Sequence, residues 1–187
     1  MKIILASKSG VRKKILEKHK INCNVIPANI DEDQVKESML SENATPKLIS
    51  KNLAELKANR ISVKKPDELV LGADSVIDLE GKLISKPKTR EEALEILKEL
   101  NGKKHRLISS VCISKNGSMI WNHTDKSKLK MKNLNLEQIK TYLENIKTEI
   151  LLSYGVYQIE AGGLDLFDEI EGDKNSIMGL PIKSIVV

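Results

Sequence analysis

Residues 69–77 read LVLGADSVI, an apolar run that is interrupted by a glycine and an aspartate. A short apolar run that contains β-branched residues is typical of a strand buried inside a sheet. A carboxylate is costly in such a place unless it is paired or coordinated, so Asp74 is predicted to face a metal, a cation or a water molecule that it activates. The alternative is an aspartate that only caps a turn at the end of the strand.

Strand and helix patterns alternate on both sides of this run. Strands are predicted where short apolar runs end in turn signals, at 1–6, 24–26, 69–77, 105–114 and 118–122. Helices are predicted where apolar residues recur at helical spacing behind a capping residue, at 10–20, 45–61, 90–100 and 136–143. Hairpin turns are expected at Glu80-Gly81 and at Lys115-Asn116-Gly117. Because a hairpin adds antiparallel strands, we expect an α/β fold with a mixed, twisted sheet and flanking helices.

The composition limits the class of protein. A chain of 187 residues fits one domain, 1–187, at about 150 residues per domain. With 40% hydrophobic residues and only 3% aromatic ones, its core is expected to consist of Ile, Leu and Val. The net charge is +5, but the lysines are spread along the whole chain. This spread favours a basic pocket for a phosphorylated small molecule over a nucleic-acid-binding surface.

The apolar runs and the cysteines suggest a compartment. No run approaches the roughly 18 residues that a membrane-spanning helix needs, so no membrane partner is expected. Residues 1–6 are too short for the apolar part of a secretion signal. Cys23 and Cys112 lie far apart without metal-binding spacing, and we interpret them as reduced core residues. These features together predict a cytoplasmic protein.

The stretch 5–13, LASKSGVRK, predicts an anion site. A strand ends there, a serine-rich turn follows, and a helix begins with two cations in its first turns. Cations beside the N-terminus of a helix are unfavourable unless an anion joins them, whereas the free N–H groups bind phosphate well. Ser7, Ser9, Arg12 and Lys13 are therefore candidates for a phosphate cradle. The alternative is Ser9 as an N-cap followed by a solvated basic helix.

Several other polar residues have both a functional and an ordinary interpretation. Asp31-Glu32-Asp33, in a predicted loop, is either a solvated segment or a source of oxygen ligands for Mg²⁺, which takes one or two carboxylates besides substrate phosphates. Lys57 and Lys86 are either phosphate ligands or surface lysines. His105 fits a structural histidine better than a catalytic base.

Residues 157–163, YQIEAGG, place glycines beside isolated polar groups, a pattern that suggests close approach of the backbone to another group. The carboxylate of Glu160 can accept hydrogen bonds from the N1–H and 2-amino groups of guanine, which thymine and uracil cannot supply together. An ordinary strand carboxylate is the alternative interpretation.

Taken together and in order, these segments resemble the Maf family of nucleoside triphosphate pyrophosphatases over nearly the whole chain. The resemblance is carried by Leu5-Ala6-Ser7-x-Ser9 with Arg12, Asp31-Glu32, Leu53-Ala54-x-x-Lys57-Ala58, Gly72-Ala73-Asp74-Ser75-Val76, Lys86-Pro87, Gly102 with His105, and Gly172 to Gly179-Leu180-Pro181. Each motif alone is weak, but their order and spacing are specific.

The resemblance implies a twisted mixed sheet with two lobes around a cleft, and hydrolysis of a nucleoside triphosphate to the monophosphate and pyrophosphate. It implies a divalent cation, Mg²⁺ or Mn²⁺, a cytoplasmic location and a homodimer. Asp74 falls on the family's proton acceptor and, with Glu32, is expected to hold the metal. Ser9, Arg12, Glu32, Lys57 and Lys86 fall on its phosphate- and metal-handling positions. Val11, Ser75 and Glu160 fall on positions that discriminate the base.

The chain departs from the family pattern in ways that bear on the base. Gly10 stands where the family has proline, and Ser153 and Glu160 replace a lysine and a glutamine of the thymidine/uridine branch. Glu160 looks like the 7-methyl-GTP branch, but that branch has tryptophan where this chain has Val11. A guanine-type triphosphate is the preferred interpretation, and a dTTP/UTP pyrophosphatase is the alternative. A nucleotide-binding regulator without catalysis, a nucleic-acid-binding module and a cell-division regulator also remain open.

Overall fold

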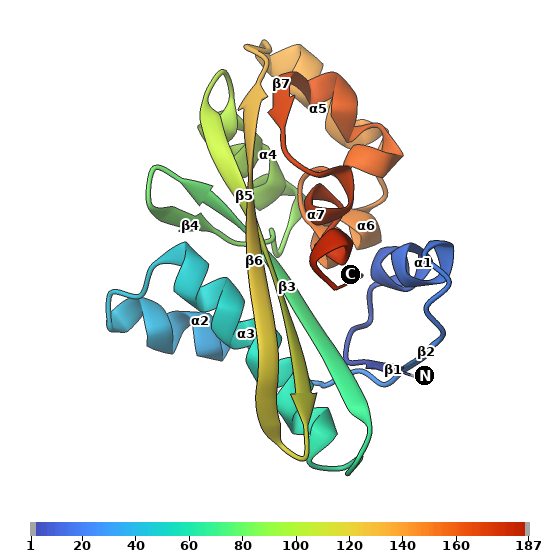
Figure 1. Ribbon diagram of the computed structural model, residues 1–187. Coiled ribbons are helices and arrows are strands. Elements are labelled where there is room, and N and C mark those ends of the chain that lie inside the picture. The colour runs from blue at the N-terminus through green and yellow to red at the C-terminus, as the bar shows by residue number, and fades with distance from the viewer. Residues whose placement is uncertain (1–2, 186–187) are drawn as a thin grey trace. The chain divides into compact units, whose positions relative to one another are not determined.

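The computed structural model describes residues 3–185. Contacts divide the chain into two compact units, each built from separate stretches of sequence. The first unit comprises Met1–Val76, Ile108–Lys126 and Asp173–Val187, and the second comprises Ile77–Leu107 and Ser127–Gly172. Figure 1 shows the chain coloured along its length, with its helices and strands labelled. Within the described residues, no helix combines the length and the apolar character needed to cross a membrane.

The strands form one seven-stranded sheet in the order β2-β1-β3-β5-β6-β7, with β4 paired to β3. Their bounds are β1 (Ile3–Leu5), β2 (Cys23–Val25), β3 (Leu69–Leu79), β4 (Lys82–Ile84), β5 (Lys104–Lys115), β6 (Ser118–Met131) and β7 (Phe167–Glu171). β1 pairs parallel with β2 and β3, whereas β4 pairs antiparallel with β3 and β7 with β6. The predicted mixed α/β sheet is therefore confirmed.

The first unit has helices on both faces of its part of the sheet. These helices are α1 (Gly10–Lys18), α2 (Glu32–Ser41), α3 (Pro46–Ser62) and the short α7 (Lys174–Ile177). Residues of β3 alternate between two core clusters, as the period of a strand requires. Leu71 and Ala73 pack with Ile15 and Leu16 of α1, whereas Val70 packs in the cluster that holds Ala54 and Ala58 of α3. The two faces of β3 are thus covered by different helices.

The second unit packs α4 (Arg90–Leu100) against α5 (Leu136–Glu144) and α6 (Thr148–Tyr154). Arg90 secures this packing by donating to the carbonyl oxygens of Leu143 and Ile146 and to Thr148 Oγ1. Two 3-10 turns, η1 (Ile159–Ala161) and η2 (Gly163–Leu166), lead into β7.

Most predicted elements are confirmed, and their caps explain their starts. The side chains of Ser9, Thr45 and Thr89 cap α1, α3 and α4 by accepting a backbone N–H three residues on. The described part of the predicted strand at 1–6 is β1, while residues 1–2 lie outside the described residues.

Two predictions about elements are wrong. Asp31–Asp33 is not a loop, because Asp31 caps α2 and the next two residues form its first turn. Acidic residues suit the positive end of a helix, but α2 buries no side chain fully, so its apolar periodicity is weak. β6 continues from the predicted end at 122 to Met131. In addition, no element was predicted where the structure forms α6. α6 has no side-chain cap, which removes the usual signal for its start.

Candidate active site

A close approach of α3 to β3 at Gly72 determines the geometry of the site. A Cβ atom at Gly72 would lie 2.1 Å from the carbonyl oxygen of Ala54 and 2.8 Å from the backbone nitrogen of Ala58. Only glycine leaves room for the helix backbone here. Lys57, which precedes Ala58 on α3, is thereby brought next to Asp74, two residues beyond the glycine on β3.

Lys57 and two carboxylates form a buried charged cluster. The Nζ atom of Lys57 lies 2.8 Å from Oδ1 of Asp74 and 2.8 Å from Oε1 of Glu32, the first residue of α2. The side chains of Lys57 and Asp74 are only 9% and 6% exposed, whereas that of Glu32 is 33% exposed. The second carboxylate oxygen of Asp74, Oδ2, is buried and has no hydrogen-bond partner among the described residues, 3–185. Oδ2 is therefore free to accept a proton or to bind a cation.

A chain of hydroxyl groups holds the backbone at Asp74. Ser50 Oγ on α3 lies 3.2 Å from the carbonyl oxygen of Asp74 and 2.9 Å from Ser110 Oγ, which lies 2.9 Å from Thr124 Oγ1. A hydroxyl group has one proton to donate, so Ser50 donates either to the carbonyl oxygen of Asp74 or to Ser110 Oγ. These hydroxyl groups hold the strand without occupying the Asp74 carboxylate.

Arg12 on α1 forms the second part of the site. Its Nε donates to the carbonyl oxygen of Gly179 at 2.9 Å, its Nη1 to Ser7 Oγ at 3.1 Å and its Nη2 to Ser75 Oγ at 3.5 Å. All three acceptors are neutral oxygens, so none of them cancels the charge of the guanidinium group. Burial lowers the pKa of Arg12, while the carboxylates of Asp74 and Glu32 oppose this shift. The arginine stays protonated at neutral pH and can bind an anion.

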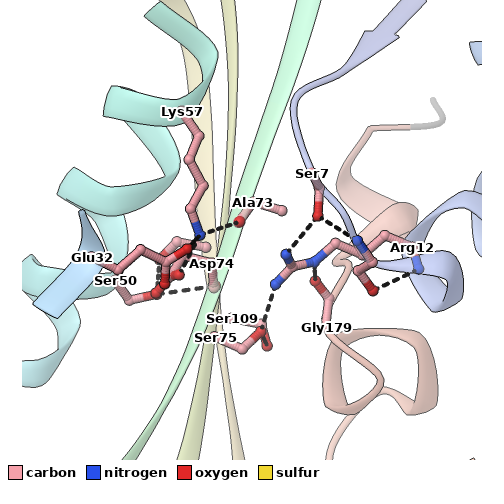
Figure 2. Close-up of polar contacts among 12 residues, drawn as sticks. Ser7, Arg12, Glu32, Ser50, Lys57, Ala73, Asp74, Ser75, Ser109 and Gly179 are labelled. Carbon is pink, nitrogen blue, oxygen red and sulfur yellow. Dashed lines mark hydrogen bonds and ion pairs between the residues drawn. The ribbon is translucent and has the colours of Figure 1, made fainter. Parts of the chain in front are cut away.

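The two parts of the site lie on opposite sides of β3. Figure 2 shows Lys57 with Glu32 and Asp74 on one side of the strand, and Arg12 with Ser7 and Gly179 on the other. β1 ends at Leu5, opposite Leu71, and its last bond to β3 runs from the N–H of Ala6 to the carbonyl oxygen of Leu71. The site therefore begins where β3 continues past the end of β1.

The structure uses the residues of the predicted phosphate cradle in different ways. Ser7 binds Arg12, and Ser9 caps α1 by accepting the N–H of Arg12 at 3.3 Å. Lys13 instead makes an exposed ion pair with Glu17 one helical turn further on. Val11, a predicted base-discriminating residue, packs against the core cluster beneath α1. The structure thus brings Ser7, Ser75 and Arg12 together and leaves Lys13 outside their hydrogen bonds.

Two predicted site residues belong to the second unit. Lys86 is exposed and follows β4. Glu160 is exposed in η1 and accepts a hydrogen bond of 3.3 Å from the side-chain amide of Gln158. The N–H groups of Ala161 and Gly163 both bind the carbonyl oxygen of Gln158, which makes this turn compact. A Cβ atom at Gly163 would lie 2.5 Å from that oxygen, so the turn requires glycine there.

The surroundings of His105, Cys23 and Cys112 agree with a structural role for the histidine and with reduced cysteines. His105 is 3% exposed, and its Nε2 lies 2.9 Å from the hydroxyl oxygen of Tyr157. Burial lowers the pKa of His105 to about 4, so the ring is neutral at pH 7. Cys23 and Cys112 are free thiols, the first half-buried and the second buried.

Four residues of the site were not among the predicted site residues: Ser50, Ser109, Ser110 and Gly179. The serine pair at 109–110 interrupts an apolar strand, which is the one local signal that these hydroxyl groups are buried and need partners. Gly179 lies in the Gly-Leu-Pro segment, but its contact with Arg12 joins positions 167 residues apart.

Comparison with known proteins identifies the family. The family model described as "Maf-like protein" matches residues 2–187. A nucleoside triphosphate pyrophosphatase of Pelagibacter ubique is 66% identical over 183 residues, covering 98% of this chain and 94% of the relative. A nucleoside triphosphate pyrophosphatase of Granulibacter bethesdensis is 40% identical over 97% of this chain and 92% of its own. A 7-methyl-GTP pyrophosphatase of Bartonella henselae is 40% identical over 99% of this chain and 92% of its own. The chain therefore belongs to the family of Maf-like proteins.

Proposed function

We propose that this protein hydrolyses a nucleoside triphosphate to the monophosphate and pyrophosphate, and that it prefers a guanine-type base such as that of 7-methyl-GTP. The general activity, a hydrolase of the nucleoside triphosphate pyrophosphatase class, follows from its family and its relatives. The preference for a guanine-type base is proposed in addition to this general activity.

The state of the Asp74 carboxylate is the observation that supports the proposed reaction. The Asp74 carboxylate is buried, its Oδ1 binds Lys57 at 2.8 Å, and its Oδ2 has no hydrogen-bond partner in the part of the chain that the structure describes. A carboxylate with one oxygen fixed and the other free is suited to orient a water molecule and to accept its proton. Oδ2 of Asp74 accepts the proton of the water that attacks the α-phosphorus. The bond from that phosphorus to the bridging oxygen then breaks and releases pyrophosphate.

The cations of the chain hold the triphosphate during this step. Hydrolysis of a phosphoanhydride depends on positioning and on neutralising negative charge, with little covalent work for the protein. Arg12, whose hydrogen bonds go to neutral oxygens, offers its charge to the phosphates from one side of β3. Lys57, whose Nζ atom lies between the carboxylates of Glu32 and Asp74, and Lys86 of the second unit are assigned the same task on the strength of the family resemblance.

The carboxylates also fit a divalent cation. Glu32 and Asp74 each place one oxygen 2.8 Å from the Nζ atom of Lys57, so their carboxylates converge. Within residues 3–185, no group of three or more His, Cys, Asp or Glu side chains could hold a metal. Two carboxylates agree with Mg²⁺ or Mn²⁺, which leave their remaining positions to phosphate oxygens and water. Held by Glu32 and Asp74, the ion would neutralise phosphate charge.

Glu160 supports the preference for guanine. It is exposed, and its carboxylate can accept two N–H bonds from the edge of guanine. The side-chain amide of Gln158 already donates to one of its oxygens, which keeps the carboxylate oriented. Val11 cannot stack on a base as an aromatic ring would, so hydrogen bonding is expected to outweigh stacking in base selection.

A substrate screen tests the function. Pyrophosphate and monophosphate are measured with 7-methyl-GTP, GTP, dTTP, UTP, CTP and ATP, in Mg²⁺ and in Mn²⁺. We expect the highest kcat/KM for a guanine-type triphosphate. A preference for dTTP or UTP would contradict the guanine assignment, and binding without turnover of any triphosphate would contradict the enzyme.

The Glu160→Gln variant tests the base contact. It should lower the ratio of guanine-type to pyrimidine kcat/KM by at least about 10-fold, the size of a hydrogen bond to a charged group. Glu169→Gln is the matched control, because Glu169 is an exposed glutamate of the same unit that pairs with Lys104 and Lys130. An unchanged ratio in Glu160→Gln would overturn the role of Glu160.

A further inference from the structure

Arg12 is held by a closed ring of hydrogen bonds. The first arm of this ring is a pair of hydrogen bonds made by the backbone of Gly179. Arg12 Nε donates to the carbonyl oxygen of Gly179, and the N–H of Gly179 donates to the carbonyl oxygen of Ser176 at 3.0 Å. The other arm runs from Arg12 Nη2 to Ser75 Oγ, on to Ser109 Oγ at 2.9 Å, and then to the same carbonyl oxygen of Ser176 at 2.7 Å. Both arms therefore end on one acceptor.

The number of protons fixes the direction of the second arm. The single hydroxyl proton of Ser109 goes to the carbonyl oxygen of Ser176, so Ser109 can only accept from Ser75. Ser75 then has no proton left for another partner, and its oxygen faces Arg12 as an acceptor. Hydrogen bonds aligned in one direction polarise one another, so the loss of Ser109 weakens the bond between Ser75 and Arg12 as well.

Ser176, where the arms meet, is anchored by two carboxylates. Its Oγ donates to Oδ2 of Asp125 on β6 at 2.5 Å, and its N–H donates to Oδ2 of Asp173 at 3.1 Å. Ser176 is 1% exposed and Ser109 is 1% exposed. The ring is thus a buried, rigid support that ties β5, β6 and the turn after α7 to the arginine of α1.

Gly179 adds a backbone condition to the ring. Its φ angle is +104°, a conformation that residues with side chains rarely adopt and that glycine adopts without strain. In this conformation the carbonyl oxygen of Gly179 accepts from Arg12.

We propose that Ser109 and Ser176 are positioning residues, which act through Ser75 and Gly179 to hold the Arg12 guanidinium in the orientation that binds phosphate. They do not touch the substrate. The use of Arg12 as a phosphate ligand rests on the proposed function, whereas its fixation by the ring does not.

The kinetic test is a double-mutant cycle. Ser109→Ala should lower kcat/KM for the best triphosphate by about 3- to 10-fold, the range of a neutral hydrogen bond, mainly through KM. In an Arg12→Ala background the same change should have almost no further effect, because the residue on which Ser109 acts is gone. Ser176→Ala, which keeps the carbonyl group but loses the bond to Asp125, should show a smaller loss with the same dependence on Arg12.

The matched control is Ser114→Ala. Ser114 is a buried serine of the same strand whose hydroxyl donates to Asn59 Oδ1 at 2.6 Å, away from Arg12. Its replacement removes a similar hydrogen bond and should leave KM unchanged. An equal rise of KM in Ser114→Ala, or full additivity of Ser109→Ala with Arg12→Ala, would overturn the positioning role.

A second measurement separates this inference from the proposed function. The Nε–H signal of Arg12 in ¹⁵N NMR of the full chain should exchange slowly with water in the wild type and at least about 3-fold faster in Ser109→Ala. Unchanged exchange in Ser109→Ala overturns the ring as a support, whatever the activity. Faster exchange in a protein that cleaves no triphosphate supports the ring and contradicts only the proposed function.

Discussion

Asp74 and Ser75 are consecutive residues of β3, yet they serve opposite sides of the strand. Asp74 binds Lys57 of α3 at 2.8 Å, and Ser75 accepts from Arg12 of α1 at 3.5 Å (Figure 2). The alternation of side chains along a strand allows two neighbouring residues to face different helices. A buried carboxylate that pairs with Lys57 and a hydroxyl group that supports Arg12 are therefore encoded side by side in one short motif.

The Asp74→Asn variant should fold normally and lose at least about 100-fold in kcat, since the amide cannot accept a proton as the carboxylate does. The measurement is pyrophosphate release from the best triphosphate. Asp78→Asn is the matched control on the same strand, because Asp78 accepts the N–H of Gly81 in the hairpin turn and asparagine can do the same. Near wild-type turnover in Asp74→Asn would remove Asp74 from the mechanism.

The Lys57→Met variant should lower the free energy of unfolding by about 3 kcal/mol, because it leaves the buried carboxylate of Asp74 and the half-buried one of Glu32 without their cation. Adding Glu32→Gln should restore part of this loss, since it removes one of the two negative charges. Urea unfolding at pH 7 measures both effects. Lys82→Met, which breaks the exposed pair with Glu99, should cost less than about 1 kcal/mol. Equal losses in the two lysine variants would contradict the importance of the buried cluster.

Gly72→Ala should destabilise the protein by at least about 2 kcal/mol and lower kcat, because the new methyl group forces α3 away from β3. The comparison is Gly10→Ala, whose Cβ would meet no atom within 4 Å at the start of α1. That change should be neutral or slightly stabilising, since alanine favours helix over glycine. Thermal unfolding and turnover, measured on both variants, test whether the close approach at Gly72 positions Lys57.

The stability of the protein should fall between pH 7 and pH 5 because of His105. Its pKa is about 4 in the folded protein, against about 6.5 for a free histidine, so the unfolded chain binds more protons in this interval. The stabilising contribution of the neutral His105 is fully present above pH 6.5 and is lost as the pH falls toward 4. At pH 5 the loss amounts to about 2 kcal/mol. Urea unfolding at both pH values should show this difference in the wild type.

The His105→Gln variant tests the origin of that dependence. Glutamine can still hydrogen-bond Tyr157 but does not titrate, so the difference between pH 7 and pH 5 should shrink by about 2 kcal/mol. The same pH dependence in wild type and variant would assign the effect to other groups.

Local chemistry made many elements predictable. Helices α1, α3 and α4 begin behind Ser9, Thr45 and Thr89, whose side chains satisfy free N–H groups. The same chemistry was present at Asp31, but α2 lacks a fully buried face, so the cap was interpreted as part of a loop. The end of β6 was missed because its buried positions, at 127, 129 and 131, alternate with lysines in a stretch that looks polar overall.

By itself, the sequence determined which residue types were available for chemistry and the alternation of strands and helices around LVLGADSVI. Only the tertiary structure decided that Lys57 pairs with Glu32 and Asp74, and that Arg12 is supported by Ser75 and Gly179. The physical reason is the distance along the chain over which each interaction acts. Caps and periodicity act within a few residues, whereas each of these contacts joins segments that are brought together by the packing of helices on the two faces of β3.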